Sequence, residues 1–111
     1  MAILVAGGKG FIGSQVITKL LAHGEQVVCL EPRDTPGRLS SVLEQVTMEV
    51  GSVTNFEDVQ SVLRKHPIER VAGLVFFAFR GAPDRLHDEM SIMVQGTANL
   101  FEAARIHGIQ R

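Results

Sequence analysis

Residues 2–13 read AILVAGGKGFIG, an apolar run of strand length that passes directly into a glycine-rich turn. The segment after the turn, residues 11–23, has apolar residues four apart and is predicted to form a helix. In such a unit one glycine permits a sharp turn, another lets the backbone approach a pyrophosphate, and the last lets helix and strand pack closely. The phosphates would face the free N–H groups near Phe11, Ile12 and Gly13, at the positive end of the helix dipole. This stretch therefore predicts an α/β fold that binds a dinucleotide.

The glycine spacing admits two frames. Gly8, Gly10 and Gly13 spell G-x-G-x-x-G, whereas Gly7, Gly10 and Gly13 spell G-x-x-G-x-x-G. Both frames predict dinucleotide binding, and the alternative interpretation is a glycine-rich turn with no ligand. A P-loop is excluded, because Lys9 precedes its glycine and no Gly-Lys-Ser or Gly-Lys-Thr follows at the required spacing.

Apolar runs alternate with helix-length segments along the whole chain, a pattern typical of parallel strands joined by crossover helices. We expect strands over residues 2–6, 26–30, 46–50 and about 71–79. Because each is apolar nearly throughout, helices should cover both faces of the sheet. The prediction is one three-layer, doubly wound Rossmann-type α/β domain over residues 1–111. Its parallel sheet should have about four strands in the order 3-2-1-4 and be incomplete at the C-terminal end.

Helices are expected over residues 11–23, 36–45, 54–66 and 87–107, the second being the shortest. The Ile12, Val16 and Leu20 side chains should form the face of the first helix that packs on the sheet. Thr54 is the expected N-cap of the third helix, with Glu57 completing a capping box.

Glycine also ends two of these helices and lies inside another. Gly24 and Gly108 each follow a histidine and can take the left-handed conformation of a helix cap. The positions that share one face of the last helix are Met93, Gly96, Leu100 and Ala104. Gly96 should permit a close approach by a neighbouring element, since a glycine inside a helix otherwise lowers stability.

Composition argues against several kinds of partner. The formal net charge is -1, with 11 basic and 12 acidic residues spread along the chain, so neither nucleic acid nor an anionic membrane is expected. Cys29 is the single cysteine and the 4 histidines lack ligand spacing, so we expect no disulfide and no metal site. The apolar N-terminus has no basic lead and is too short for a signal core. A reducing, cytoplasmic setting fits these features.

Glu31 stands at the end of the second expected strand, directly after residue 30, where this fold places an acid that accepts hydrogen bonds from the adenosine ribose. Such a carboxylate favours NAD and would repel the 2′-phosphate of NADP. Arg33 lies two residues further on, and Lys9 and Arg38 could also come near, so NADP stays open. The alternative for Arg33 is a solvated loop charge.

Two segments carry a resemblance to a known family. Residues 5–14, VAGGKGFIGS, and residues 96–105, GTANLFEAAR, are similar to the opening motif and the fourth helix of the extended short-chain dehydrogenase/reductases. These are NAD-dependent epimerases and dehydratases that act on nucleotide sugars and related substrates. The resemblance covers essentially all of the chain and selects the frame of Gly7, Gly10 and Gly13. It implies NAD as cofactor, oxidoreductase chemistry on a hydroxyl or carbonyl substrate, and a homodimer formed through the fourth helix.

The chain departs from the family pattern at several positions. Ser52, followed by Val53, stands where the family usually has an aspartate that reads the adenine amino group. A large ring, Phe79, ends the turn that follows the fourth strand, and it either narrows the site or belongs to the core. In the fourth helix, Met93 takes the place of an asparagine that is common in the family, so the polar support that this asparagine gives is lost. The cofactor-binding residues expected from the turn and from the resemblance are Gly7, Gly10, Phe11, Ile12, Gly13, Glu31, Arg33, Ser52, Val53, Phe77, Ala78 and Phe79.

Catalysis in that family uses a Tyr-x-x-x-Lys pair, and this sequence contains no tyrosine. In that chemistry the tyrosinate is the general acid/base, while the lysine lowers its pKa and holds the ribose. We therefore expect the N-terminal, cofactor-binding half of such an enzyme, with no catalytic residue of its own. The alternatives are a non-catalytic module that senses NAD(P) and a truncated product that has no activity and exposes a sheet edge.

Overall fold

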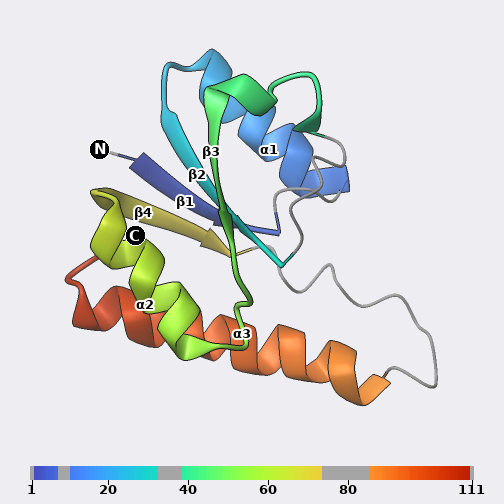
Figure 1. Ribbon diagram of the computed structural model, residues 1–111, viewed down its shortest axis with the longest axis vertical. Helices are drawn as coiled ribbons and strands as arrows, with labels where there is room; N and C mark the ends of the chain where they lie inside the picture. Colours follow the sequence, from blue (N-terminus) through green and yellow to red (C-terminus); the bar gives the residue numbers. More distant parts are fainter. Residues whose placement is uncertain (1, 8–10, 33–38, 74–85, 111) are drawn as a thin grey trace.

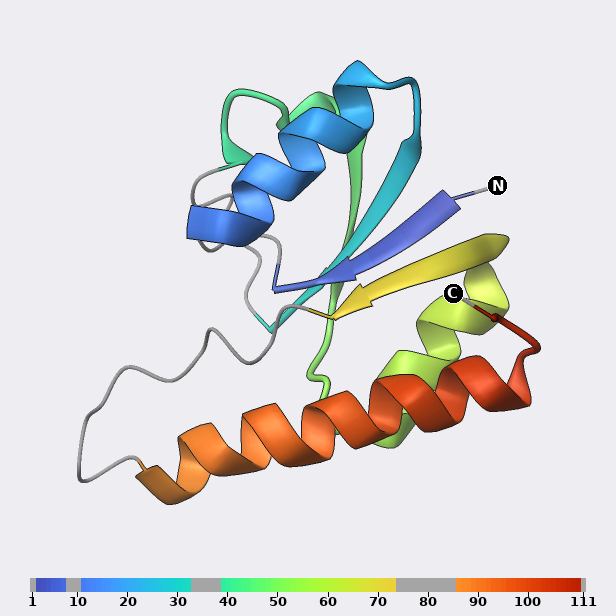
Figure 2. The same cartoon turned by 180° about the vertical axis from the view of Figure 1, so that it is seen from behind.

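The computed structural model describes residues 2–7, 11–32, 39–73 and 86–110. Its elements are, in chain order, β1 (Ala2–Ala6), α1 (Phe11–Ala22), β2 (Gln26–Glu31), the 3-10 turn η2 (Leu43–Gln45), β3 (Val46–Val50), α2 (Phe56–Lys65), β4 (Ile68–Gly73) and α3 (Leu86–Ile106). The strands form a parallel sheet in the order β3-β2-β1-β4. Helix α1 covers one face, and α2 and α3 cover the other (Figures 1 and 2). The predicted three-layer α/β fold and its strand order are confirmed.

The central strand β1 explains why the apolar runs have no polar alternation. Ile3 and Val5 point into a cluster with Ile17 of α1, while Leu4 points to the opposite face and packs in a cluster with Leu100 of α3. Every residue of β1 is buried. A strand covered on both faces must be apolar at every position, and this constraint made β1 recognisable in the sequence.

The strand register brings the carboxyl ends of the strands to one edge of the sheet. Ala6 of β1 lies beside Leu30 of β2 and Gly73 of β4, and Leu30 lies beside Glu49 of β3. Figure 1 shows the ends of β1, β2 and β4 converging there. Residues that follow these strands are therefore gathered at the edge where open α/β sheets bind ligands.

The fourth strand differs from its prediction. It begins at Ile68, not at residue 71, and is described as far as Gly73, while residues 74–79 lie outside the described part. The charged pair Glu69 and Arg70 interrupts the apolar run and concealed the start of the strand. Arg70 can belong to the strand because its charge is paired, with Nη2 lying 3.0 Å from Glu25 Oε1. Ile68, at the start of the strand, is buried in the core.

The buried face of α1 is also rotated from the predicted one. Ile12 is 42% exposed, whereas Ile17 is fully buried and Leu20 and Leu21 pack beside it. Residues spaced four apart drift around a helix of 3.6 residues per turn, so a face centred on Ile17 leaves Ile12 outside it.

The N-cap of α2 is Asn55 and not Thr54. Asn55 has extended backbone angles, and its Oδ1 accepts a hydrogen bond from the Asp58 N–H at 3.2 Å. Thr54 Oγ1 instead contacts Ser52 Oγ at 2.6 Å. The predicted capping box is wrong as well, because Glu57 pairs with Arg64 further along the helix.

The other helices follow their predictions more closely, with one exception. Over residues 36–45, positions 36–38 lie outside the described part, and the remainder contains turns and η2 with no α-helix. Gly24 and Gly108 have φ of 78° and 74°, which confirms both left-handed caps. The His23 Nδ1–H also donates to the Lys19 carbonyl at 2.8 Å at the end of α1.

The predicted face of α3 points inward. Gly96 and Leu100 are buried, while Met93 and Ala104 are half-buried. Asn99 and Ala103 are also buried, so the inward face contains two residues that the sequence pattern did not include.

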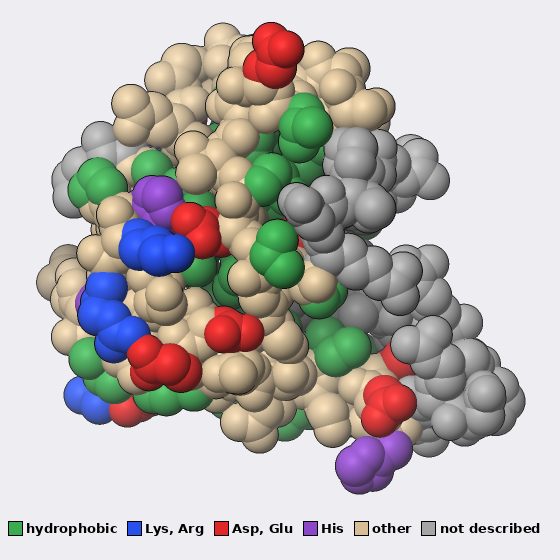
Figure 3. Space-filling model, viewed as in Figure 1, with side chains coloured by type: hydrophobic (Ala, Val, Ile, Leu, Met, Phe, Trp, Pro, Cys, Tyr) green, Lys and Arg blue, Asp and Glu red, His purple; other side chains and the backbone are tan. Residues whose placement is uncertain are grey.

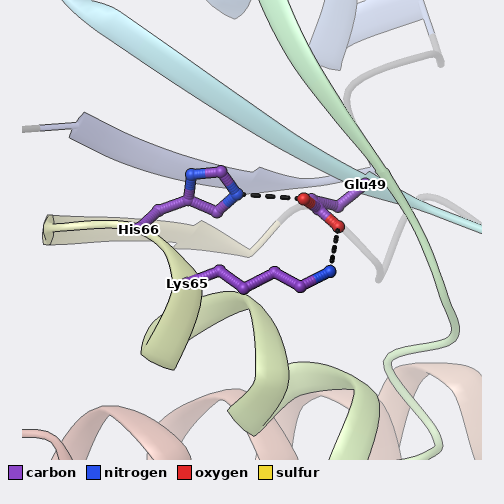
Figure 4. A network of polar contacts seen from close by, with 3 residues as sticks. All are labelled: Glu49, Lys65 and His66. Atoms are coloured by element: carbon purple, nitrogen blue, oxygen red, sulfur yellow. Dashed lines mark hydrogen bonds and ion pairs between the residues drawn. The ribbon is translucent and has the colours of Figure 1, made fainter.

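A polar cluster joins the edge strand β3 to the end of α2 (Figure 4). His66 Nε2 lies 3.0 Å from Glu49 Oε1, and Lys65 Nζ lies 3.5 Å from Glu49 Oε2. A carboxylate only accepts, so the His66 hydrogen lies on Nε2. The space-filling view shows acidic and basic side chains next to one another on this face (Figure 3).

Candidate cofactor-binding site

The glycine turn leaves the carboxyl end of β1 and enters α1. Gly7 has a φ of 88°, a left-handed conformation that a side chain would strain. Helix α1 begins at Phe11, so the first turn of the helix contains Ile12 and Gly13. Gly13 is buried, as expected of a glycine that lets helix and strand approach closely. Gly10 lies outside the described residues.

Glu31 is the last residue of β2 and is only 8% exposed. It follows Cys29 by two residues, so its side chain lies on the same face of the sheet as α1. The Cys29 thiol donates to Glu31 Oε1 at 3.7 Å. A carboxylate therefore stands at the carboxyl end of the strand beside β1, where the fold expects an acid for the ribose.

The segment after β3 lies next to Glu31. The Gly51 N–H donates to the Glu31 carbonyl at 2.8 Å, which joins the ends of β2 and β3. Ser52 and Val53 follow directly, and the Val53 side chain is buried in the core. The residues expected at the ribose and at the adenine are thus brought to adjacent strand ends.

The Ser52 hydroxyl is held within its own loop. Its oxygen contacts Thr54 Oγ1 at 2.6 Å and accepts the Thr54 N–H at 3.2 Å. The carboxylate at this loop belongs to Asp58, in the first turn of α2, whose Oδ2 accepts the Ser52 N–H at 3.0 Å.

Sequence reasoning missed two residues at this loop. Asp58 and Asn99 both bond to its backbone, and Asn99 is separated from its partner Val53 by 46 residues. Asn99 was not among the residues of the predicted inner face, and its only signal in the sequence was its position three residues after Gly96 and next to Leu100, beside that face.

Several predicted site residues cannot be placed in this arrangement. The predictions for Gly10, Arg33, Phe77, Ala78 and Phe79 fall outside the described residues. For Phe11 the structure describes the backbone alone. The described part therefore brings together Gly7, the start of α1, Glu31 and the Ser52–Val53 pair.

Within residues 2–7, 11–32, 39–73 and 86–110, no group of three or more His, Cys, Asp or Glu side chains is arranged to hold a metal ion. Among the helices described, none is both long enough and apolar enough to cross a bilayer.

The carboxyl-edge geometry defines a dinucleotide-binding class of α/β protein, and comparison with known proteins gives the family. Residues 3–111 match the NAD dependent epimerase/dehydratase family. The chain belongs to this family.

Curated relatives match the chain over a similar extent. It is 31% identical over 115 residues to a UDP-glucose 4-epimerase of Lacticaseibacillus casei, covering 100% of this chain and 34% of that protein. It is 30% identical over 114 residues to a 3-beta-hydroxysteroid dehydrogenase of Mycolicibacterium neoaurum, covering 98% and 30%. The chain thus spans about a third of the length of these relatives.

Solved structures agree with the fold. The Bordetella bronchiseptica enzyme WbmG in complex with NAD and UDP superposes with a TM-score of 0.85 at 26% identity, covering 100% of this chain and 36% of that one. The Thermus thermophilus UDP-glucose 4-epimerase in complex with NAD gives 0.80 at 29% identity, covering 99% and 35%.

Proposed function

We propose that this chain binds NAD along the carboxyl edge of its sheet and is the cofactor-binding domain, residues 1–111, of an NAD-dependent oxidoreductase. The glycine turn and the start of α1 would hold the pyrophosphate. Glu31 would accept hydrogen bonds from the adenosine ribose, and the loop after β3 would contact the adenine. The observation that supports this proposal is the hydrogen bond from the Gly51 N–H to the Glu31 carbonyl, because it joins the ends of β2 and β3, from which we propose the ribose and adenine contacts.

The residues present fit NAD better than NADP. Glu31 is a buried carboxylate at the end of β2, where we propose that the ribose binds, and a 2′-phosphate would meet like charge there. Two of the solved relatives, WbmG and the Thermus thermophilus epimerase, are complexes with NAD. Arg33 is the residue through which NADP would be accommodated.

The chemistry that NAD supplies is hydride transfer to or from the substrate. We propose a nucleotide sugar or a related hydroxyl or carbonyl compound as substrate, in line with the epimerases and the hydroxysteroid dehydrogenase among the relatives. Since the sequence has no tyrosine, the general acid/base would come from outside these residues. The role proposed for this chain is to bind and orient the dinucleotide. Cys29 is the single cysteine of the sequence and is buried, which suits a reducing, cytoplasmic compartment.

Calorimetric titration of the natural full-length protein with NAD, NADH and NADP tests this proposal. We expect Glu31→Gln to weaken NAD binding by about tenfold, the effect of losing one charge-assisted hydrogen bond. The preference for NAD over NADP should shrink at the same time. Glu44→Gln, which changes an exposed acid in η2, is the matched control and should leave both affinities unchanged.

Two results would refute the site. One is wild-type protein that releases no binding heat with any of the three dinucleotides. The other is a Glu31→Gln variant that binds NAD and NADP as the wild type does.

We also propose a homodimer formed through α3. Three large apolar side chains, Met90, Val94 and Phe101, are 44%, 63% and 75% exposed. They lie four and seven residues apart, so they share one side of the helix. No other described residue covers this apolar stripe of α3. An exposed apolar stripe supports an interface in which the same stripe of a second copy of the chain packs against it.

A further inference from the structure

The β3–α2 loop, residues 51–55, is held by side chains from two different helices. Asp58 Oδ2 of α2 accepts the Ser52 N–H at 3.0 Å, and Asn99 Nδ2 of α3 donates to the Val53 carbonyl at 2.7 Å. Between these two bonds, the Ser52 carbonyl accepts the Asn55 N–H at 3.0 Å. Three successive peptide groups of the loop are thus each fixed by a hydrogen bond.

Asn99 is well suited to holding a peptide group. It is 6% exposed, and Gln95 Nε2 donates to its Oδ1 at 3.2 Å. That bond occupies the amide oxygen and turns the Asn99 NH₂ group toward the Val53 carbonyl. A buried amide satisfied at both ends has little freedom to rotate.

These bonds fix the direction of the Val53 N–H. The Ser52 carbonyl and the Val53 N–H belong to one planar peptide group and point in opposite directions. Since the carbonyl turns toward Asn55, the N–H turns away from it. None of the hydrogen bonds found among the described residues uses this N–H, although the Val53 side chain is anchored in the core.

We propose that Asp58 and Asn99 are positioning residues that aim the Val53 N–H at the adenine ring, and so make this loop selective for adenine. The inference rests on the proposed NAD site. A fixed N–H donor favours a base that presents an acceptor. Adenine N1 is an acceptor, whereas N1 of hypoxanthine carries a hydrogen, so a well-aimed donor discriminates between the two bases.

The test compares the affinities of the natural full-length protein for NAD and for nicotinamide hypoxanthine dinucleotide, measured by calorimetry. Wild-type protein should prefer NAD. Asn99→Ala and Asp58→Ala should each weaken NAD binding by about tenfold, because the donor is no longer held in place. They should affect the hypoxanthine dinucleotide much less, so the ratio of the two affinities falls.

Two variants separate positioning from general stability. Asp58→Asn keeps an oxygen that can accept the Ser52 N–H, so it should restore the preference that Asp58→Ala loses. Glu102→Gln changes an exposed acid on α3 and should leave the ratio unchanged. A general loss of stability would weaken both dinucleotides alike. Asp58→Ala decides the question if Asn99→Ala fails to fold, since Asp58 is only partly buried.

The outcomes distinguish this inference from the proposal on which it rests. Wild-type protein that binds neither dinucleotide overturns both. Wild-type protein that binds NAD, with alanine variants that keep the same ratio of affinities, overturns the positioning role alone.

Discussion

At the scale of single residues, Glu49 is a described acid whose ionisation bears on stability. The hydrogen bond from His66 lowers the pKa of the Glu49 carboxyl below its ordinary value of 4.5, and the charge of Lys65 acts in the same direction. Burial opposes them by favouring the neutral form. The carboxylate connects an edge strand to the end of α2, so its charge links two elements that are adjacent only in the fold.

The sign of the pH effect follows from this lowered pKa. Stabilisation by Glu49 should be fully present above its unfolded pKa near 4.5 and disappear as the pH falls through the lower folded pKa. We expect Glu49→Gln to lower the free energy of unfolding by about 0.5–1 kcal/mol at pH 7, the range for a partly exposed pair. Urea denaturation at pH 7 and at low pH measures the effect, which should shrink on acidification.

The control for this prediction is Glu57→Gln, which removes a more exposed acid from the pair with Arg64. It should change stability less than Glu49→Gln at pH 7. An effect of Glu49→Gln that stays constant or grows on acidification would contradict the assignment.

At the scale of elements, the start of α2 shows the limit of reading caps from sequence. Thr54 and Asn55 are adjacent and both are good N-cap residue types, so only the backbone angles decide between them. We expect Asn55→Ala to lower the free energy of unfolding by about 1 kcal/mol, the usual effect of losing a cap. Thr54→Ala should cost less, because its hydroxyl is exposed and bonds within the loop.

Chemical denaturation of both variants checks this order. A larger loss of stability for Thr54→Ala than for Asn55→Ala would indicate that Thr54 is the N-cap.

The strands were easier to predict than the cap, because burial on both faces leaves a long apolar run in the sequence. The start of β4 was missed because the charged residues Glu69 and Arg70 interrupt the apolar run that predicts a buried strand.

At the scale of the whole molecule, the layered fold and the position of the glycine turn follow from local sequence patterns. The strand–turn–helix at residues 2–22 needs only neighbouring residues to be recognised. The bonds of Asp58 and Asn99 to the loop after β3 could not be predicted in this way. Asn99 reaches the loop only once α3 has packed against α2 and the sheet, which no local pattern encodes.

The proposed homodimer also concerns the whole molecule. Val94→Glu places a charge on the exposed apolar stripe of α3 and should weaken self-association by about tenfold or more, because a charge buried at an interface is costly. Sedimentation velocity over a range of concentrations measures it, with Glu102→Gln as the control on the same helix. If the wild type stays monomeric at every concentration, or if Val94→Glu associates as strongly as the wild type, the proposed interface through α3 is wrong.

NAD is proposed to bind at the carboxyl edge of the sheet, and the amide chemical shifts of the isotope-labelled natural protein report on binding at each residue. On addition of NAD, the largest shifts should fall on Gly7, Ser52 and Val53, which follow strand ends, and on Gly13 in the first turn of α1. The amides of Gln26 and Ile68, at the opposite edge, should stay unchanged. Shifts concentrated at that opposite edge, or no shifts at saturating NAD, would show that NAD does not bind at the carboxyl edge.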